Sequence, residues 1–221
     1  MRHEHHITVE RTARYFTIEP AEGRVREVWF VCHGYAQLAD RFLRPFEALD
    51  DGTRLIVAPE ALARFYLRED APPSGAGRIG ASWMTREDRI SDVADTVQYL
   101  DALARRIFRR VDRAAVTLRV LGFSQGAAAA ARWAVQGGTR PDQLVLWGLH
   151  LPPDLDLSAA PDLGRLPVLL VWGDQDRYYD AARAADDADR LARIGARHRI
   201  VTFAGGHRLS AAVLRDIAAE S

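Results

Sequence analysis

Short runs of apolar residues recur along the chain, and stretches with helical spacing separate most of them. Each run is five to eight residues long and nearly unbroken, which is typical of strands covered on both faces of a sheet. We therefore expect strands at 25–32, 54–58, 116–121, 143–147, 168–172 and 199–203.

The stretches between the runs place apolar residues three or four positions apart, the period of an amphipathic helix. The clearest is 86–110, where one face would carry Ile90, Val93, Val97, Leu100, Leu103 and Ile107. Helices are also expected at 37–49, 124–136, 180–194 and 209–219. Because strand and helix alternate, the sequence predicts an α/β fold with a mostly parallel central sheet flanked by helices on both faces.

Two segments fit the alternation less well. Residues 7–18 alternate loosely and predict one or two edge strands. Residues 60–85 are the least regular part, with a loop composition at 71–77 and flanking aromatic residues. A long irregular segment in a compact domain is often functional, so we expect it to cover the active site.

Length and composition narrow the function. The chain has 221 residues, enough for one sizeable domain over 1–221. Basic and acidic residues number 30 each, and all the basic ones are arginine, so nothing favours binding to nucleic acid. The lone Cys32 excludes an internal disulfide and favours a reducing compartment. No apolar run reaches membrane-spanning length, and the first residues do not form a signal peptide, so we expect a cytoplasmic protein.

The run at 116–121 leads into Gly122-Phe123-Ser124-Gln125-Gly126, and an alanine-rich stretch follows. A serine on a sharp strand-to-helix turn stands clear of the sheet, and glycine is needed two residues to either side. This context predicts that Ser124 is a nucleophile and that the Gln125 amide faces the developing oxyanion. The alternative is a serine that only caps the helix.

A nucleophilic serine needs a base, and the base needs a carboxylate. His207 follows the last expected strand on a glycine turn, so we predict it as the base. The acid follows the preceding strand, where Asp174 and Asp176 compete and Asp176 is preferred. His198 starts a strand and would lie at the wrong end of the sheet, whereas His150 could line the pocket or merely pack.

A second oxyanion donor is expected in the loop after the first buried strand, which ends in His33-Gly34-Tyr35. There the amide of Tyr35 would donate, although the segment could also be a turn beside a core histidine. Candidate pocket walls are Phe65, Tyr66, Trp83, Met84 and His150, and these aromatic residues could equally anchor a long loop. No spacing of histidine and cysteine suggests a metal site, and no cofactor is expected.

Together these motifs resemble the phospholipase/carboxylesterase family of α/β-hydrolases, which includes acyl-protein thioesterases and bacterial carboxylesterases. The matching pieces are 33–34, 122–126, 173–176 and 206–207, and Ser82-Trp83-Met84 resembles the family's substrate-side loop. The resemblance implies Ser124, Asp176 and His207 as catalytic residues, with the amides of Tyr35 and Gln125 as oxyanion hole.

The sequence departs from the family after His33-Gly34 and after Asp176, which bears most on the choice of substrate. We expect a serine esterase acting on short- to medium-chain acyl esters or thioesters, without stable membrane insertion. A homodimer is common among similar proteins. The alternatives are a peptidase or lactone hydrolase on the same fold, or a non-catalytic binding module.

Overall fold

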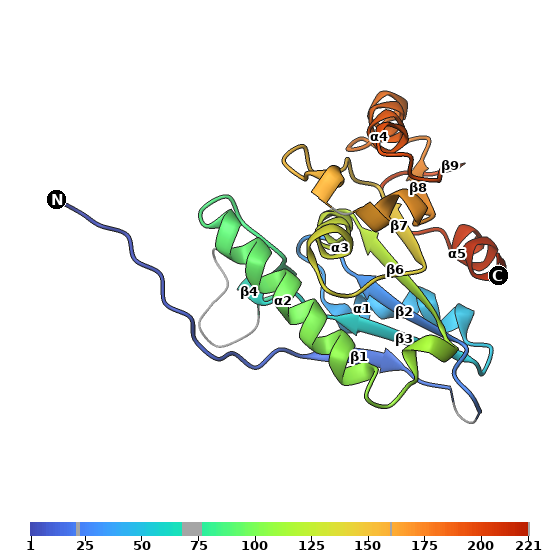
Figure 1. Ribbon diagram of the computed structural model, residues 1–221, viewed down its shortest axis with the longest axis horizontal. Coiled ribbons are helices and arrows are strands. Elements are labelled where there is room, and N and C mark those ends of the chain that lie inside the picture. Colours follow the sequence, from blue (N-terminus) through green and yellow to red (C-terminus); the bar gives the residue numbers. More distant parts are fainter. Residues whose placement is uncertain (21–22, 68–76, 160, 221) are drawn as a thin grey trace.

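The structure is a computed structural model, which describes residues 1–20, 23–67, 77–159 and 161–220. In this part of the chain, seven strands form one sheet in the order β1-β3-β2-β6-β7-β8-β9 (Figure 1). All neighbouring strands are parallel except the edge strand β1, which is antiparallel to β3. The strands are β1 Tyr15–Ile18, β2 Glu27–Cys32, β3 Arg54–Pro59, β6 Thr117–Phe123, β7 Gln143–Trp147, β8 Val168–Gly173 and β9 His198–Phe203.

Helices cover both faces of this sheet, as its buried strands require. Alternate residues of β2 enter two separate cores: Phe30 packs with the side of α2 and α3, and Trp29 packs with the side of α1 and α5. Both faces of β2 are therefore buried, which explains its unbroken apolar run. The helices are α1 Ala39–Leu43, α2 Arg89–Ile107, α3 Gln125–Gln136, α4 Ala181–Arg193 and α5 Ala211–Ala219.

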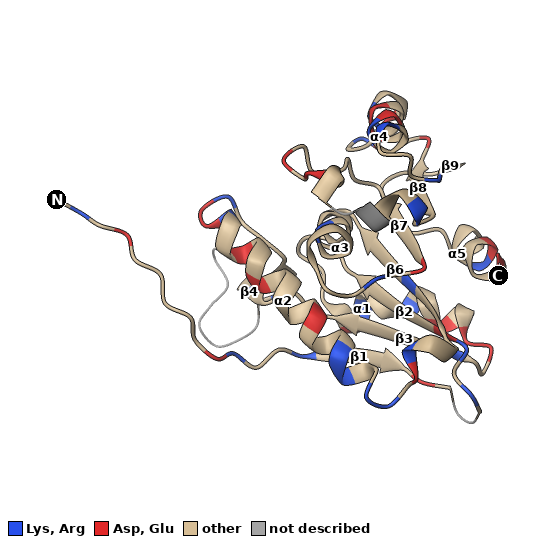
Figure 2. Ribbon diagram, in the orientation of Figure 1, with Lys and Arg blue, Asp and Glu red and all other residues tan. Residues whose placement is uncertain are grey.

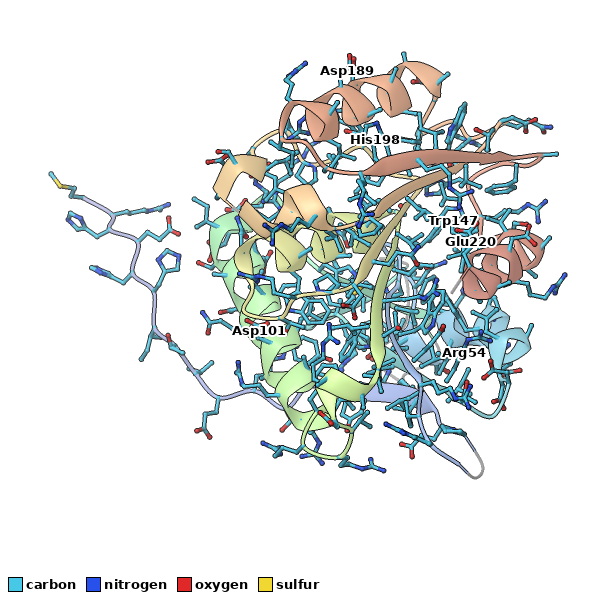
Figure 3. The ribbon with its side chains drawn as sticks, turned by 45° about the vertical axis from the view of Figure 1, so that its right-hand side comes forward. Arg54, Asp101, Trp147, Asp189, His198 and Glu220 are labelled. Atoms are coloured by element: carbon cyan, nitrogen blue, oxygen red, sulfur yellow. The ribbon has the colours of Figure 1, made fainter. Side chains whose placement is uncertain are left out.

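Polar contacts fix two of these helices in place. Asp101 of α2 (labelled in Figure 3) accepts a hydrogen bond of 2.8 Å from the indole Nε1 of Trp133 in α3. Arg54 at the start of β3 donates to the carbonyl oxygen of Ala218 in α5 at 3.0 Å, on the side where Figure 3 shows Arg54 and Glu220. Each bond joins elements that are far apart in sequence.

The expected α/β architecture is confirmed, with local differences at its edges. The expected helix 37–49 is split into α1 and a 3₁₀ helix, Arg44–Leu49, because Pro45 has no amide hydrogen to continue the α-helix. Of the expected edge strands in 7–18, only β1 forms. Ile90 was expected on the buried face of α2 but is 84% exposed, since it lies in the first turn of the helix.

The irregular segment 60–85 contains a two-stranded antiparallel hairpin, β4 Ala63–Tyr66 and β5 Ile79–Ser82. The loop composition at 71–77 lies almost entirely outside the described residues, so its predicted covering role stays a prediction. The hairpin itself docks on the turn after β2, because Ala81 exchanges backbone hydrogen bonds with Ala36 and Gln37.

Figure 2 shows basic and acidic residues interspersed over the helices and loops, in keeping with the zero formal net charge. No described helix is long and apolar enough to cross a bilayer.

The thiol of Cys32 is fully buried at the end of β2, and burial raises its pKa to about 12. Since the thiolate is the reactive form, we expect a disulfide reagent such as dithionitrobenzoate to leave the native protein unmodified at pH 8. One thiol per chain should react after unfolding in guanidinium. Rapid reaction of the folded protein would contradict the burial of Cys32.

Candidate active site

The order of the strands in the sheet indicates where a binding site would lie. The chain builds β2 and β3 on one side and then returns to β6 on the other, so the direction of winding reverses between β2 and β6. In open parallel sheets, ligands bind beyond the carboxyl ends of the strands at this point of reversal. Ser124 follows β6 directly, and His33 to Tyr35 follow β2, so both candidate segments lie at the reversal.

Ser124 occupies the sharp turn between β6 and α3, with φ 53° and ψ −125°. Its amide donates to the carbonyl oxygen of Trp147 at 2.8 Å, which fixes the turn against β7. Although Ser124 stands at the N-cap position, its hydroxyl makes no capping hydrogen bond. The hydroxyl is therefore not engaged as a simple helix cap.

The two glycines of the motif are required by close backbone contacts. A Cβ on Gly122 would lie 2.2 Å from the carbonyl oxygen of Gly126, and one on Gly126 would lie 2.2 Å from that of Cys32. Neither backbone can move away cheaply, so larger residues are excluded at both positions. Since Gly126 has no Cβ, the start of α3 packs closely against the end of β2, and this close packing brings the Gln125 and Tyr35 segments together.

His207 and Asp176 are joined by a hydrogen bond of 2.7 Å between imidazole Nδ1 and carboxylate Oδ2. The other carboxylate oxygen of Asp176 accepts from the amide of Tyr178 at 2.8 Å. The imidazole also packs on the ring of Phe123, with centroids 4.8 Å apart. His207 thus lies beside the residue that precedes Ser124. No hydrogen bond joins Ser124 and His207 within the described residues.

Asp174 has a different role from Asp176. Its Oδ1 accepts from the amide of Gly205 at 2.9 Å, which links the loop after β8 to the loop that carries His207. Of the two competing carboxylates, the structure therefore pairs Asp176 with the imidazole. His198 is the first residue of β9, so it lies at the amino end of that strand, whereas His207 follows its carboxyl end, as expected.

The amides of Tyr35 and Gln125 have no hydrogen-bond partner among the described residues. Gln125 is the first residue of α3, where amides have no acceptor within the helix. Next to Tyr35, Ala36 has φ 63°. Ala36 and Ser124 are the non-glycine residues with positive φ in the described chain, and both flank this site. Backbone strain of this kind concentrates at functional sites.

His33 is a fully buried support for this turn, as the alternative interpretation of the sequence had it. Its Nε2 accepts from the amide of Ala61 at 3.1 Å, and its Nδ1 lies 2.8 Å from the carbonyl oxygen of Gly34. Burial lowers the pKa of the imidazole, so the ring is neutral and Nδ1 is the donor. His33 therefore holds Gly34 and the following Tyr35 in position.

The side chain of Gln125 makes contacts that the sequence did not reveal. Its Oε1 accepts from the amide of Trp83 at 3.0 Å, and its Nε2 donates to the carbonyl oxygen of Met84 at 2.9 Å. The indole of Trp83 is buried and donates to the carbonyl oxygen of His33 at 2.7 Å. The end of the β4-β5 hairpin is thereby fixed to both strands that carry the site. The one signal in the sequence was the resemblance of residues 82–84 to a family loop.

The remaining candidate wall residues have varied surroundings. Phe65 stacks on Tyr35 with ring centroids 5.3 Å apart, whereas Tyr66 is 52% exposed. His150 Nδ1 lies 2.9 Å from the buried carboxylate of Asp187, which also accepts from the hydroxyl of Tyr179 at 2.9 Å. Burial raises the pKa of Asp187. This cluster joins the loop after β7 to the segment that follows Asp176.

A cavity of about 440 Å³ opens beside the imidazole, and we call it the His207 cavity. Phe123 and His207 form one side, and the segment 36–38 after the Tyr35 turn forms another. Its volume is within the range of small-molecule sites. None of the five candidate wall residues lines it, so their role in the pocket stays a prediction.

Gly148, with φ 67°, faces the paired residues: an added Cβ would lie 3.1 Å from His207 Nδ1 and 3.3 Å from Asp176 Oδ2. We expect Gly148→Ala to displace the imidazole and to lower the ester turnover expected from the sequence about 10- to 100-fold, because a small misplacement of a catalytic group costs about 10²-fold. Kinetics with a chromogenic ester measure this effect.

Gly195 provides the matched control, since it has φ 73° and open space around its Cβ position. Gly195→Ala therefore carries similar backbone strain, about 1 kcal/mol, without crowding a neighbour. Gly148→Ala should therefore lose at least as much thermal stability as Gly195→Ala, and only Gly148→Ala should lose turnover. An equal loss of turnover in both would show that Gly148 does not act through His207.

Solved structures with the same fold extend this description. The carboxylesterase of Mesorhizobium loti has 18% sequence identity and a TM-score of 0.71, over 95% of either chain. Acyl-protein thioesterase 2 of Zea mays has 18% identity and a TM-score of 0.71, over 94% of this chain and 96% of that one. A phospholipase/carboxylesterase of Dyadobacter fermentans has 15% identity and a TM-score of 0.69, over 96% and 98%. No family model and no curated protein sequence matches the chain.

The chain therefore has the α/β-hydrolase fold. The resemblance expected from the sequence, to the phospholipase/carboxylesterase family, is confirmed at the level of the fold along almost the whole chain.

Proposed function

We propose that the protein is a serine hydrolase of carboxylic esters or thioesters that acts through an acyl-enzyme. The observation that carries this proposal is the His207–Asp176 hydrogen bond of 2.7 Å, located beside the strained turn that presents Ser124. The fold supports it, because the similar structures are named as esterases and thioesterases. A binding module needs neither the strained serine nor the paired imidazole, so the non-catalytic alternative is disfavoured.

Acylation begins when Ser124 Oγ attacks the acyl carbon and His207 Nε2 takes the hydroxyl proton. The Nδ1 proton stays in the bond to Asp176, which holds the ring and stabilises the imidazolium. The tetrahedral oxyanion then accepts hydrogen bonds from the amides of Tyr35 and Gln125. When the oxyanion collapses, the bond to the alcohol or thiol breaks, and His207 gives its proton to this leaving group.

Deacylation repeats these steps with water. His207 takes a proton from the water as its oxygen attacks the acyl carbon, and the bond to Ser124 Oγ breaks while the proton returns to the serine. The products are one carboxylic acid and one alcohol or thiol, so one water is consumed per turnover. Ser124 in place of a cysteine disfavours a lactone hydrolase of the dienelactone type.

The experiment is hydrolysis of p-nitrophenyl butyrate and of a matched butyryl thioester by the intact protein. We expect saturable turnover of at least one of them, abolished by prior treatment with a fluorophosphonate. Turnover that survives this treatment would point to another nucleophile. Absence of both turnover and labelling would favour the non-catalytic module.

A further inference from the structure

Three arginines are the charged side chains that line the His207 cavity within the described part of the chain. Arg41 of α1, Arg78 just before β5 and Arg208 directly after His207 come from three separate segments. No aspartate or glutamate lines the cavity within the described residues. The chain as a whole has 30 basic and 30 acidic residues, so this one-signed lining is a local feature.

Like several other exposed arginines in the described part of the chain, these three have unpaired guanidinium groups. Within the described chain, none of their guanidinium groups forms an ion pair or a hydrogen bond with another residue. By contrast, Arg54 pairs with Glu27 at 3.0 Å and Arg132 with Asp154 at 2.9 Å. Because the three residues line one cavity, their unpaired guanidinium groups are available there to bind an anion, and their planar fork matches a carboxylate.

Apart from Gln37 and His207, the rest of the cavity is apolar. Its walls include Leu38, Phe42, Pro45, Leu67, Ile79 and Leu209. An occupant that suits both parts has a short hydrocarbon segment against these walls and an anionic group beside the arginines. Ser124 does not itself line the cavity, but Phe123 directly before it and His207 do, so this occupant would extend away from the ester bond that Ser124 attacks.

We infer that the enzyme selects esters carrying a carboxylate a few carbons away from the scissile bond, and that Arg41, Arg78 and Arg208 determine this specificity. The inference rests on the proposed function, since it names the substrate class of the same site. It predicts a preference that neither the fold nor the triad requires.

The test compares esters that differ only in this charge. The 4-nitrophenyl monoester of adipic acid carries the carboxylate on the acyl side, and its methyl ester is the neutral match. 4-(Butyryloxy)benzoate carries it on the alcohol side, and its methyl ester is again the neutral match. We expect kcat/KM for at least one acid to exceed that of its methyl ester by about tenfold or more, as an ion pair at a partly exposed site allows. The preferred pair identifies which part of the ester enters the cavity.

Arginine variants then assign the preference. Arg41→Gln, Arg78→Gln and Arg208→Gln should each lower the acid-to-methyl-ester ratio about two- to threefold, and the triple variant should bring it close to one. Arg109→Gln is the control. Arg109 is exposed and comes before the amino end of β6, whereas His207 follows the carboxyl end of β9. This variant should leave the ratio unchanged. Raising the salt concentration should lower the ratio in the wild type, since screening weakens exposed ion pairs.

The experiment distinguishes failure of the specificity inference from failure of the esterase proposal. If the wild type hydrolyses each methyl ester as fast as its acid, or if the triple variant keeps the wild-type ratio, the specificity inference is overturned while the esterase proposal stands. If the wild type hydrolyses no ester and Ser124 is not labelled, both proposals fall. Reading a ratio separates an anion-binding role from a general loss of folded protein, which would lower both rates equally.

Discussion

Ser124→Ala should hydrolyse p-nitrophenyl butyrate about 10⁴ to 10⁶ times more slowly than the wild type, because members of a triad act as a unit. The variant loses the proposed nucleophile and keeps the rest of the site, including the 2.7 Å bond between His207 and Asp176. Steady-state kinetics at matched protein concentration measure the loss. A variant that retains more than about one tenth of the turnover would exclude Ser124 as the nucleophile.

Ser124→Gly separates activity from stability at the same position. Since φ 53° and ψ −125° are strained for a residue with a Cβ, glycine should relieve about 1–3 kcal/mol of strain. We therefore expect Ser124→Gly to unfold at a higher temperature than the wild type and to be equally inactive as Ser124→Ala. Loss of turnover in a more stable protein cannot arise from unfolding. A lower melting temperature would argue against strain at this turn.

Asp176→Asn should lower kcat for the same ester about 10³- to 10⁴-fold, as the equivalent change does in known triads. The amide cannot stabilise the imidazolium, and it favours the wrong tautomer of His207. The change is nearly isosteric, and the acceptor for the Tyr178 amide is retained. Kinetics across pH 6 to 9 measure the loss.

Asp174→Asn is the matched control two residues away. Asp174 accepts one hydrogen bond from the Gly205 amide, and an asparagine oxygen can accept it equally well. We expect this variant to keep at least about one third of the wild-type kcat, within the effect of an exposed polar substitution. If Asp174→Asn were the more damaging of the two, the assignment of the acid would have to be exchanged.

The turn at Ser124 could be predicted because short-range sterics determine it. Glycine is needed at 122 and 126 because a Cβ at either position would lie 2.2 Å from a backbone oxygen, and this requirement fixes the spacing of the two glycines around Ser124. The chain order of serine, aspartate and histidine could also be predicted, because the carboxyl ends of parallel strands lie on the same side of the sheet. Both arguments use positions that are close in sequence or placed by the alternation of elements.

Contacts between distant residues could not be predicted in this way. Arg119 lies in the middle of β6 and is buried, although arginine in an apolar strand suggests exposure. It donates to the side chain of Gln143 in β7 and to the carbonyl oxygen of Ile217 in α5, both at 2.8 Å. The second partner is 98 residues away in sequence. Nothing local in the sequence identifies it.

The residues that line the His207 cavity could not be predicted from the sequence either. Arg41, Arg78 and Arg208 are separated by many residues and belong to no motif, so only the fold brings them to one cavity. The aromatic residues around 60–85 were instead noticeable in the sequence, and Trp83 turned out to be a buried anchor for the hairpin. Apolar anchors and apolar pocket walls have the same composition, so pattern alone does not separate them.

The most direct test of the central claim is peptide mapping by mass spectrometry after the native protein has reacted with a fluorophosphonate. The account predicts one adduct per chain, located on Ser124, and none in protein unfolded before the reaction. An unlabelled Ser124 in folded protein, or a single adduct on another residue, would contradict the claim that this turn presents an activated nucleophile.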